Sequence, residues 1–201
     1  MKPVSVLLTI KTIAGVCART MLFTTVWWAT FAVAQESVVE AIKNGQANVV
    51  LMRHALAPGT GDPFNFTLVQ CDTQRNLNDV GRQQAVDTGD FFRTHGIEFA
   101  GVYTSQWCRC VETAQLLNMA SGVDELPVIN SFFQQMHKAD DQTSALKRWL
   151  AGQADQSAVL LVTHQVNITA YTGVYPQSGE LVVGNVDGGG EFTLLGRIDP
   201  R

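Results

Sequence analysis

Nitrogen-bearing side chains that could bind an anion follow three apolar runs of the sequence. In chain order they are Arg53 with His54, then Arg109, then His164. Arginine presents a planar fork of N–H donors that fits phosphate oxygens. Imidazole has an ordinary pKa of about 6.5, so a neutral nitrogen nucleophile is available near neutral pH. Four such groups without an obvious carboxylate partner would repel one another around an empty space, and they therefore predict an anionic guest.

The apolar runs predict the strands that must position these residues. Predicted strands are 48–52, 99–105, 126–130, 158–164, 180–186 and 190–198, the last two forming a hairpin through Asp187-Gly188-Gly189-Gly190. Predicted helices lie at 37–44, 78–96, 107–121 and 141–152, with another after His164. This alternation predicts an α/β three-layer sandwich, a mostly parallel central sheet with helices on both faces. Ligands of such sheets bind beyond the C-terminal strand ends, where these side chains are expected to meet.

Residues 55–76 are rich in Gly, Pro, Asp and Asn and predict a long loop directly after His54. A loop of this length in a compact domain is usually functional.

The first 34 residues predict a cleavable signal peptide. A positive start is followed by the uncharged run 21–34, which ends in a small-x-small motif at Ala32-Val33-Ala34. A retained anchor is the alternative, although the run is short for a bilayer, which takes roughly 20 apolar residues. Residues 35–201 are then a single domain, periplasmic or secreted, with no stable membrane insertion after cleavage.

The mature chain is acidic. The leader holds three of the 14 Lys and Arg and none of the 18 Asp and Glu, so the remainder has a net charge of about −7. Such a surface argues against nucleic acid as a partner.

Three cysteines remain after cleavage. In an exported protein we expect a disulfide from Cys71 to either Cys108 or Cys110, and the sequence leaves the pairing open. The spacing of the three cysteines matches no familiar zinc site, and we expect no metal. The oligomeric state is also left open.

The sequence resembles the histidine phosphatase superfamily, also called phosphoglycerate mutase-like. The matches are Arg53-His54-Ala55 for the Arg-His-Gly signature, Leu77-x3-Gly81-x2-Gln84-Ala85, Ser105-x3-Arg109-x3-Thr113-Ala114 and Val162-Thr163-His164. They occur in the family's order and spacing, and together they span most of residues 35–201. The resemblance implies the phosphoglycerate mutase-like fold for this domain.

The resemblance also implies roles for these residues. His54 would be the nucleophile that forms a phosphohistidine, while Arg53, Arg109 and His164 would bind the equatorial phosphoryl oxygens. No cofactor is expected. Further donors to the substrate, a small phosphorylated molecule, are expected from Arg75, Thr163 and Gln165.

The sequence departs from the family at the general acid. Many members carry a Glu shortly after the third strand, where this chain reads VINSFFQQMHKADD, and the acid phosphatase branch has Asp where Gln165 stands. The acid is unassigned, with candidates Asp62, Asp72, Asp140 and Asp141. The sequence thus predicts an exported, metal-independent phosphomonoester phosphatase, and the alternative is a phosphate-ligand binding protein that has weak or no turnover.

Overall fold

Two buried parallel strands, β1 (Val49–Arg53) and β4 (Val159–Thr163), form the centre of the sheet. All five residues of β4 are buried, because helices cover both of its faces. The structure is a computed structural model and describes residues 35–154 and 157–200. The predicted signal peptide, residues 1–34, lies outside the described residues.

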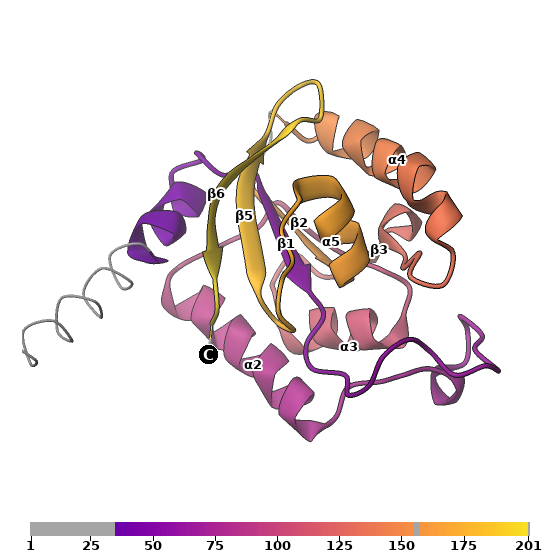
Figure 1. Cartoon of the computed structure of the whole chain (residues 1–201). Coiled ribbons are helices and arrows are strands. Elements are labelled where there is room, and N and C mark those ends of the chain that lie inside the picture. Colours follow the sequence, from indigo (N-terminus) through magenta and orange to yellow (C-terminus); the bar gives the residue numbers. More distant parts are fainter. Residues whose placement is uncertain (1–34, 155–156, 201) are drawn as a thin grey trace, which may run out of the picture. The chain divides into compact units, whose positions relative to one another are not determined.

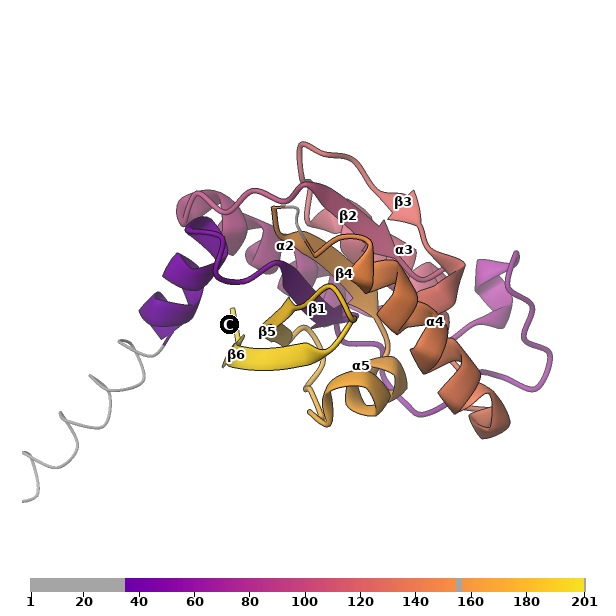
Figure 2. The same ribbon diagram turned by 90° about the horizontal axis from the view of Figure 1, so that it is seen from above.

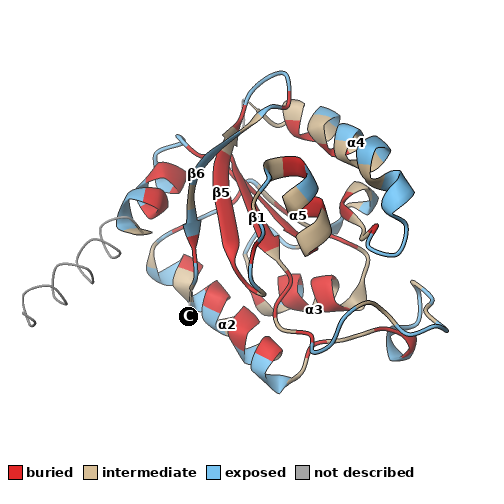
Figure 3. Ribbon diagram, in the orientation of Figure 1, coloured by how far each residue is buried: buried red, intermediate tan, exposed pale blue. Residues whose placement is uncertain are grey.

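The described strands form one mixed sheet in the order β3-β2-β4-β1-β5-β6. β2 (Gly101–Thr104) and the two-residue β3 (Asp124–Glu125) continue the parallel half. β5 (Leu181–Val186) and β6 (Phe192–Ile198) form the antiparallel hairpin that the sequence predicts. β6 is an edge strand and is largely exposed, whereas β1 and β5 are buried (Figure 3).

Helices cover both faces of the sheet (Figures 1 and 2). One apolar cluster joins the sheet to α2 (Asp79–Thr94), to α3 (Cys108–Leu116) and to the helix over residues 35–43. A second joins the other face to α4 (Ala139–Ala151) and α5 (Gln165–Thr172). The three-layer architecture expected from the alternating pattern is confirmed.

Helix ends follow the local sequence. α2 begins where the Asn78 side chain accepts a hydrogen bond from the Gly81 amide, which satisfies one free N–H of the first turn. It ends before Gly96, which adopts a left-handed φ of 63°. None of the described helices, in residues 35–154 and 157–200, is long and apolar enough to cross a membrane.

The predicted third strand at 126–130 is wrong. The strand β3 is shorter and lies earlier, and residues Pro127–Ile129 form the 3-10 turn η2. Proline has no N–H to donate to a ladder, and its fixed φ suits the first position of a helical turn. Two further 3-10 turns, η1 (Cys71–Thr73) and η3 (Met136–Lys138), lie in the connections.

Candidate active site

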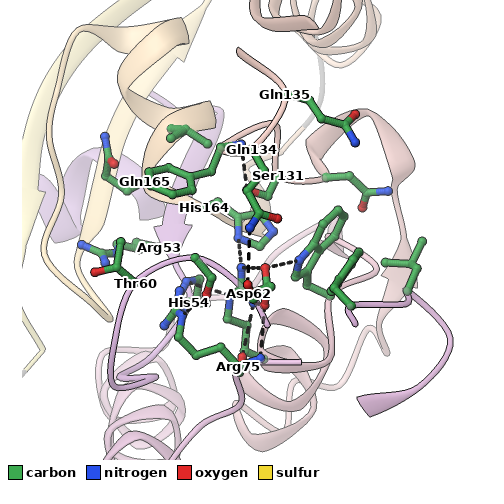
Figure 4. A pocket seen from close by; sticks show the side chains of 18 of the residues that line it. Arg53, His54, Thr60, Asp62, Arg75, Ser131, Gln134, Gln135, His164 and Gln165 are labelled. Carbon is green, nitrogen blue, oxygen red and sulfur yellow. Dashed lines mark hydrogen bonds and ion pairs between the residues drawn. The ribbon is translucent and has the colours of Figure 1, made fainter. Parts of the chain in front are cut away.

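The strand register brings the two histidines together. Arg53 of β1 pairs with Thr163 of β4, so the next residue of each strand, His54 and His164, lies at the same edge. The His54 amide donates to the Thr163 carbonyl at 2.9 Å, which extends the pairing by one residue. The two imidazole centroids lie 5.5 Å apart, and both rings are almost fully buried (Figure 4).

Arg109 lies between the two imidazoles. It is in the first turn of α3 and is 3% exposed. Its Nε donates to His54 Nε2 at 3.2 Å, and its Nη2 lies 3.4 Å from His164 Nδ1. A guanidinium can only donate, so both ring nitrogens that face it carry lone pairs.

His54 is held as the Nδ1–H tautomer. Its Nδ1 lies 2.8 Å from the Ala55 carbonyl oxygen, which can only accept. Nε2 is therefore the nitrogen with the lone pair, which accepts from Arg109 Nε. Burial first, and then the charge of Arg109, lower the pKa of His54 well below its ordinary value. The neutral, nucleophilic form of this imidazole is thus the resting form.

Asp62 forms an ion pair with the Nη1 and Nη2 groups of Arg109. Its two carboxylate oxygens accept from Nη1 at 2.7 Å and Nη2 at 3.2 Å, a bidentate pair in which both side chains are buried. Trp107 Nε1 and the Arg75 amide donate to the same carboxylate at 3.0 and 3.1 Å. Burial raises the pKa of Asp62, but these donors and the charge of Arg109 outweigh it, so its pKa is lowered overall.

Arg53 and Arg75 complete the positive lining of the pocket. Arg53 donates from Nη1 to the Pro176 carbonyl at 3.0 Å, whereas its buried Nε has no partner among the described residues. Arg75 donates from Nε to the Gly61 carbonyl at 2.8 Å and from Nη1 to the Ala57 carbonyl, so it also anchors the long loop. Burial lowers the pKa of both guanidinium groups. A buried donor without a partner in a cationic pocket is suited to an anion.

These residues line a pocket of about 460 Å³ (Figure 4). Its rim combines aromatic and amide side chains: Phe66, Trp107, Phe133, Tyr175, Gln134 and Gln135. Phe66 stacks on Trp107 with ring centroids 5.2 Å apart.

The comparisons with known proteins agree with this geometry. The family model described as histidine phosphatase superfamily (branch 1) matches residues 49–131, which include Arg53, His54 and Arg109. Over these residues the chain is similar to the histidine phosphatase superfamily.

Solved structures with the same fold cover most of the chain. The protein histidine phosphatase SixA complexed with tungstate is 16% identical with a TM-score of 0.57, over 76% of this chain and 96% of its own. A phosphoserine phosphatase from Entamoeba histolytica, in complex with 3-phosphoglyceric acid, is 14% identical with a TM-score of 0.55, over 75% and 96%. A mycobacterial glucosyl-3-phosphoglycerate phosphatase is 16% identical with a TM-score of 0.52, over 74% and 97%. No curated protein matches the chain in sequence. At sequence identities of 14–16%, the similarity to these solved structures shows the fold alone.

The superfamily motif on α2 supports the segment that follows His54. Gln84 accepts from the Leu56 amide at 3.0 Å and donates to the Ser178 carbonyl at 2.7 Å. A Cβ on Gly81 would lie 2.1 Å from the Leu56 carbonyl oxygen, so only glycine allows this approach. The motif thus fixes the backbone two residues beyond the histidine.

Thr113 of the α3 motif links Arg109 to the same segment. Its hydroxyl donates to the Arg109 carbonyl at 2.6 Å and accepts from the Ala55 amide at 3.1 Å. One side chain therefore couples the strand that carries His54 to the helix that carries Arg109.

Not every predicted donor faces the pocket. The prediction that Thr163 offers its hydroxyl to substrate is wrong, because that hydroxyl is buried and donates to the Ile129 carbonyl at 2.7 Å. Gln165 does line the pocket, and its side-chain Nε2 donates to Thr169 Oγ1 at 2.9 Å. That its backbone N–H donates to substrate stays a prediction. Five predicted residues do line the pocket: Arg53, His54, Arg75, Arg109 and His164.

The acid candidates separate clearly. Asp62 lines the pocket, while Asp72, Asp140 and Asp141 are exposed and do not. Asp62 is ionised and its oxygens are occupied by four N–H donors, so it has no proton to give. Sequence reasoning identifies Asp62 as a candidate acid but misses its partnership with Arg109.

The cysteine pairing is resolved as Cys71–Cys108, which ties the long loop to the first residue of α3, next to Arg109. Cys110 is buried and forms no disulfide with the other described cysteines, and its Sγ lies 3.5 Å from His164 Nε2. Burial raises the pKa of its thiol to about 12, so it stays protonated and is not a second nucleophile.

Among the described residues, no cluster of three or more His, Cys, Asp and Glu side chains could hold a metal ion.

Proposed function

We propose that this protein is a phosphomonoester phosphatase that works through a phosphohistidine on His54. The observation that carries the proposal is the orientation of that ring. Nδ1–H is held by the Ala55 carbonyl, and the Nε2 lone pair faces a cationic pocket. Nε2 attacks phosphorus, the P–O bond to the leaving group breaks, and water then hydrolyses the P–N bond.

Positive side chains would replace a metal ion in this reaction. In the resting site the five N–H groups of Arg109 all have acceptors: His54, His164, the Arg75 carbonyl and the two oxygens of Asp62. An entering phosphoryl group offers better acceptors than the two imidazoles, because its oxygens are charged. Arg109 then turns its Nε–H and Nη2–H groups from the imidazoles to those oxygens. This releases the Nε2 lone pair of His54 for attack. Arg53 adds its Nε donor, which none of the described residues engages.

We also propose that the protein is exported. The proposal rests on the signal-like residues 1–34 and on the Cys71–Cys108 disulfide, since disulfides persist in oxidising compartments. The substrate is then a small phosphorylated molecule outside the cytoplasm.

The test is a phosphatase screen of the wild type beside His54→Ala, each with and without EDTA. We expect the wild type to release phosphate equally in both conditions and His54→Ala to lose at least ~10³-fold in kcat/KM, as when a nucleophile is removed. Equal activity of the two proteins would refute the role of His54, and loss of activity in EDTA would refute metal independence. A wild type that binds phosphate but releases none from any substrate would favour the binding-protein alternative.

A further inference from the structure

The proposed reaction needs a proton for its leaving group, and no carboxyl group of the described pocket is available to supply it. Among the residues that line the pocket, Asp62 is the acidic one, and it is ionised and clamped by Arg109. An alkoxide is a poor leaving group, so phosphoryl transfer from an ordinary alcohol ester needs a general acid. Another group at the pocket must therefore carry a proton to the leaving-group oxygen.

A chain of hydrogen bonds fixes the tautomer of His164. The Gln106 amide donates to Asn130 Oδ1 at 2.8 Å, which identifies that atom as the oxygen of the amide side chain. The Ser105 hydroxyl lies 3.2 Å from the same oxygen and must donate to it. The Ser105 oxygen therefore accepts from His164 Nε2, 2.8 Å away, and this ring nitrogen carries the proton.

The two histidines are thus neutral and opposite in tautomer. His54 holds its proton on Nδ1 and turns Nε2 to Arg109, while His164 holds its proton on Nε2 and turns Nδ1 to Arg109. Both lone pairs face the same pocket from neighbouring strands. One lone pair is the nucleophile of the proposed reaction. The other, once Arg109 turns to the substrate, is a proton acceptor beside it.

The surroundings of His164 determine when it takes up a proton. It faces Arg109 and Cys110 from α3, His54 from the end of β1, and Arg53 and Arg75 at the pocket wall. Burial first, and then the charge of Arg109, lower the pKa of His164 well below its ordinary value. His164 is therefore neutral in the empty site. A phosphomonoester whose second pKa is about 6 can bring one proton with it as the monoanion.

We infer that His164 is the general acid and base of this site, and that Ser105 with Asn130 positions it, an assignment that rests on the proposed function. The substrate monoanion gives its proton to Nδ1. As His54 Nε2 forms the P–N bond, Nδ1–H protonates the departing oxygen, and a neutral alcohol leaves. In the second step Nδ1 takes a proton from the attacking water as the P–N bond breaks. Inorganic phosphate then takes that proton from Nδ1 as it leaves, so His164 returns to its neutral form.

The test compares leaving groups of different acidity. We would measure kcat/KM of wild type and His164→Asn with p-nitrophenyl phosphate, phenyl phosphate and an alkyl phosphate, in order of decreasing leaving-group acidity. The Asn amide can replace the Nδ1–H hydrogen bond to a phosphoryl oxygen but cannot release a proton. We expect less than about tenfold loss with the nitrophenyl ester and about 10²-fold or more with the other two. His164→Gln serves as a second variant if the first does not give a wild-type near-UV spectrum.

Arg53→Gln is the matched control, because it removes a phosphoryl-binding donor from the same pocket. Its loss should be the same factor for all three esters. Ser105→Ala should reproduce the leaving-group dependence of His164→Asn in weaker form, which a merely structural role of Ser105 would not do. If kcat/KM of His164→Asn fell by the same factor for all three esters, the role of His164 as acid and base would be overturned, while the proposed function would stand. A wild type that never forms a phosphohistidine would overturn the proposed function, and this assignment with it.

Discussion

Asp62 and Arg109 form a bidentate buried ion pair, with Nη1–Oδ1 at 2.7 Å and Nη2–Oδ2 at 3.2 Å. The pair leaves Nε and the inner N–H of Arg109 directed at the two imidazoles. Asp62 also offsets part of the charge of Arg109 and of Arg75. The carboxylate thus orients the cation that the phosphoryl group would meet.

Removal of Asp62 should destabilise the fold. Asp62→Ala leaves Arg109 buried and unpaired, and we expect the free energy of unfolding to fall by about 3–5 kcal/mol. Denaturant unfolding measures this change. Asp72→Ala is the matched control, since Asp72 is an exposed acid of the same loop. This substitution should lower the free energy of unfolding by no more than about 0.5 kcal/mol. An Asp62→Ala protein as stable as the wild type would show that the pair does not hold Arg109.

Stability should fall as the solution is acidified below neutrality. The pKa values of His54 and His164 are lowered in the fold, so below about 6.5 the unfolded chain binds more protons than the folded one. The stability from two neutral histidines is present above that pH and is lost as pH falls, by up to about 1.4 kcal/mol per pH unit for each ring.

Urea unfolding between pH 7.5 and 5 checks this prediction. His164→Asn should show a shallower dependence than the wild type, because it removes one of the two groups. A stability independent of pH over this range would contradict the protonation states assigned to both rings.

Reduction of the disulfide should loosen the pocket as well as the fold. Cys71 and Cys108 are 37 residues apart, and opening a loop of that size costs about 4 kcal/mol by the chain-entropy relation. The bond anchors the end of the long loop that carries Asp62 and Arg75, so kcat/KM should fall together with the melting temperature. Cys71→Ala/Cys108→Ala supplies the control, because a reductant should not affect it further. If reduction left both quantities unchanged in the wild type, the disulfide would not be holding the loop in place.

Glycine at position 81 should be required for activity. The close approach of α2 leaves no room for a Cβ beside the Leu56 carbonyl, two residues from His54. We expect Gly81→Ala to cost about 1–3 kcal/mol of stability by overpacking and to lower kcat/KM by displacing that segment. Gly188→Ala has open space around it and should change neither quantity. Equal behaviour of the two variants in thermal melts and assays would refute the close approach.

The strands and the histidine pair could be predicted from the sequence. Continuous apolar runs mark strands buried on both faces, and parallel strands place residues that follow them, such as His54 and His164, at one edge. The segment 126–130 is predicted wrongly as a strand because its apolar residues outweigh the local effect of Pro127 in the pattern.

Contacts made through the long loop could not be predicted. Asp62 and Arg109 are 47 residues apart, and no local pattern gives the path of the intervening loop. The cysteine pairing stays open in the sequence for the same reason, since Cys108 and Cys110 differ only in which side of α3 they occupy. The link between Ser105 and His164 depends on Asn130, whose position follows from the turn η2, which the sequence pattern does not predict.

The central claim is that His54 carries the phosphoryl group, and rapid acid-free quenching tests it most directly. The wild type is mixed with a ³²P-labelled phosphomonoester, denatured within the first turnover under alkaline conditions that preserve phosphohistidine, and digested for peptide mapping. We expect the label on the peptide that contains His54, attached to Nε2, and no label in His54→Ala. Label on another residue, or phosphate release by the wild type without any labelled intermediate, would contradict the account.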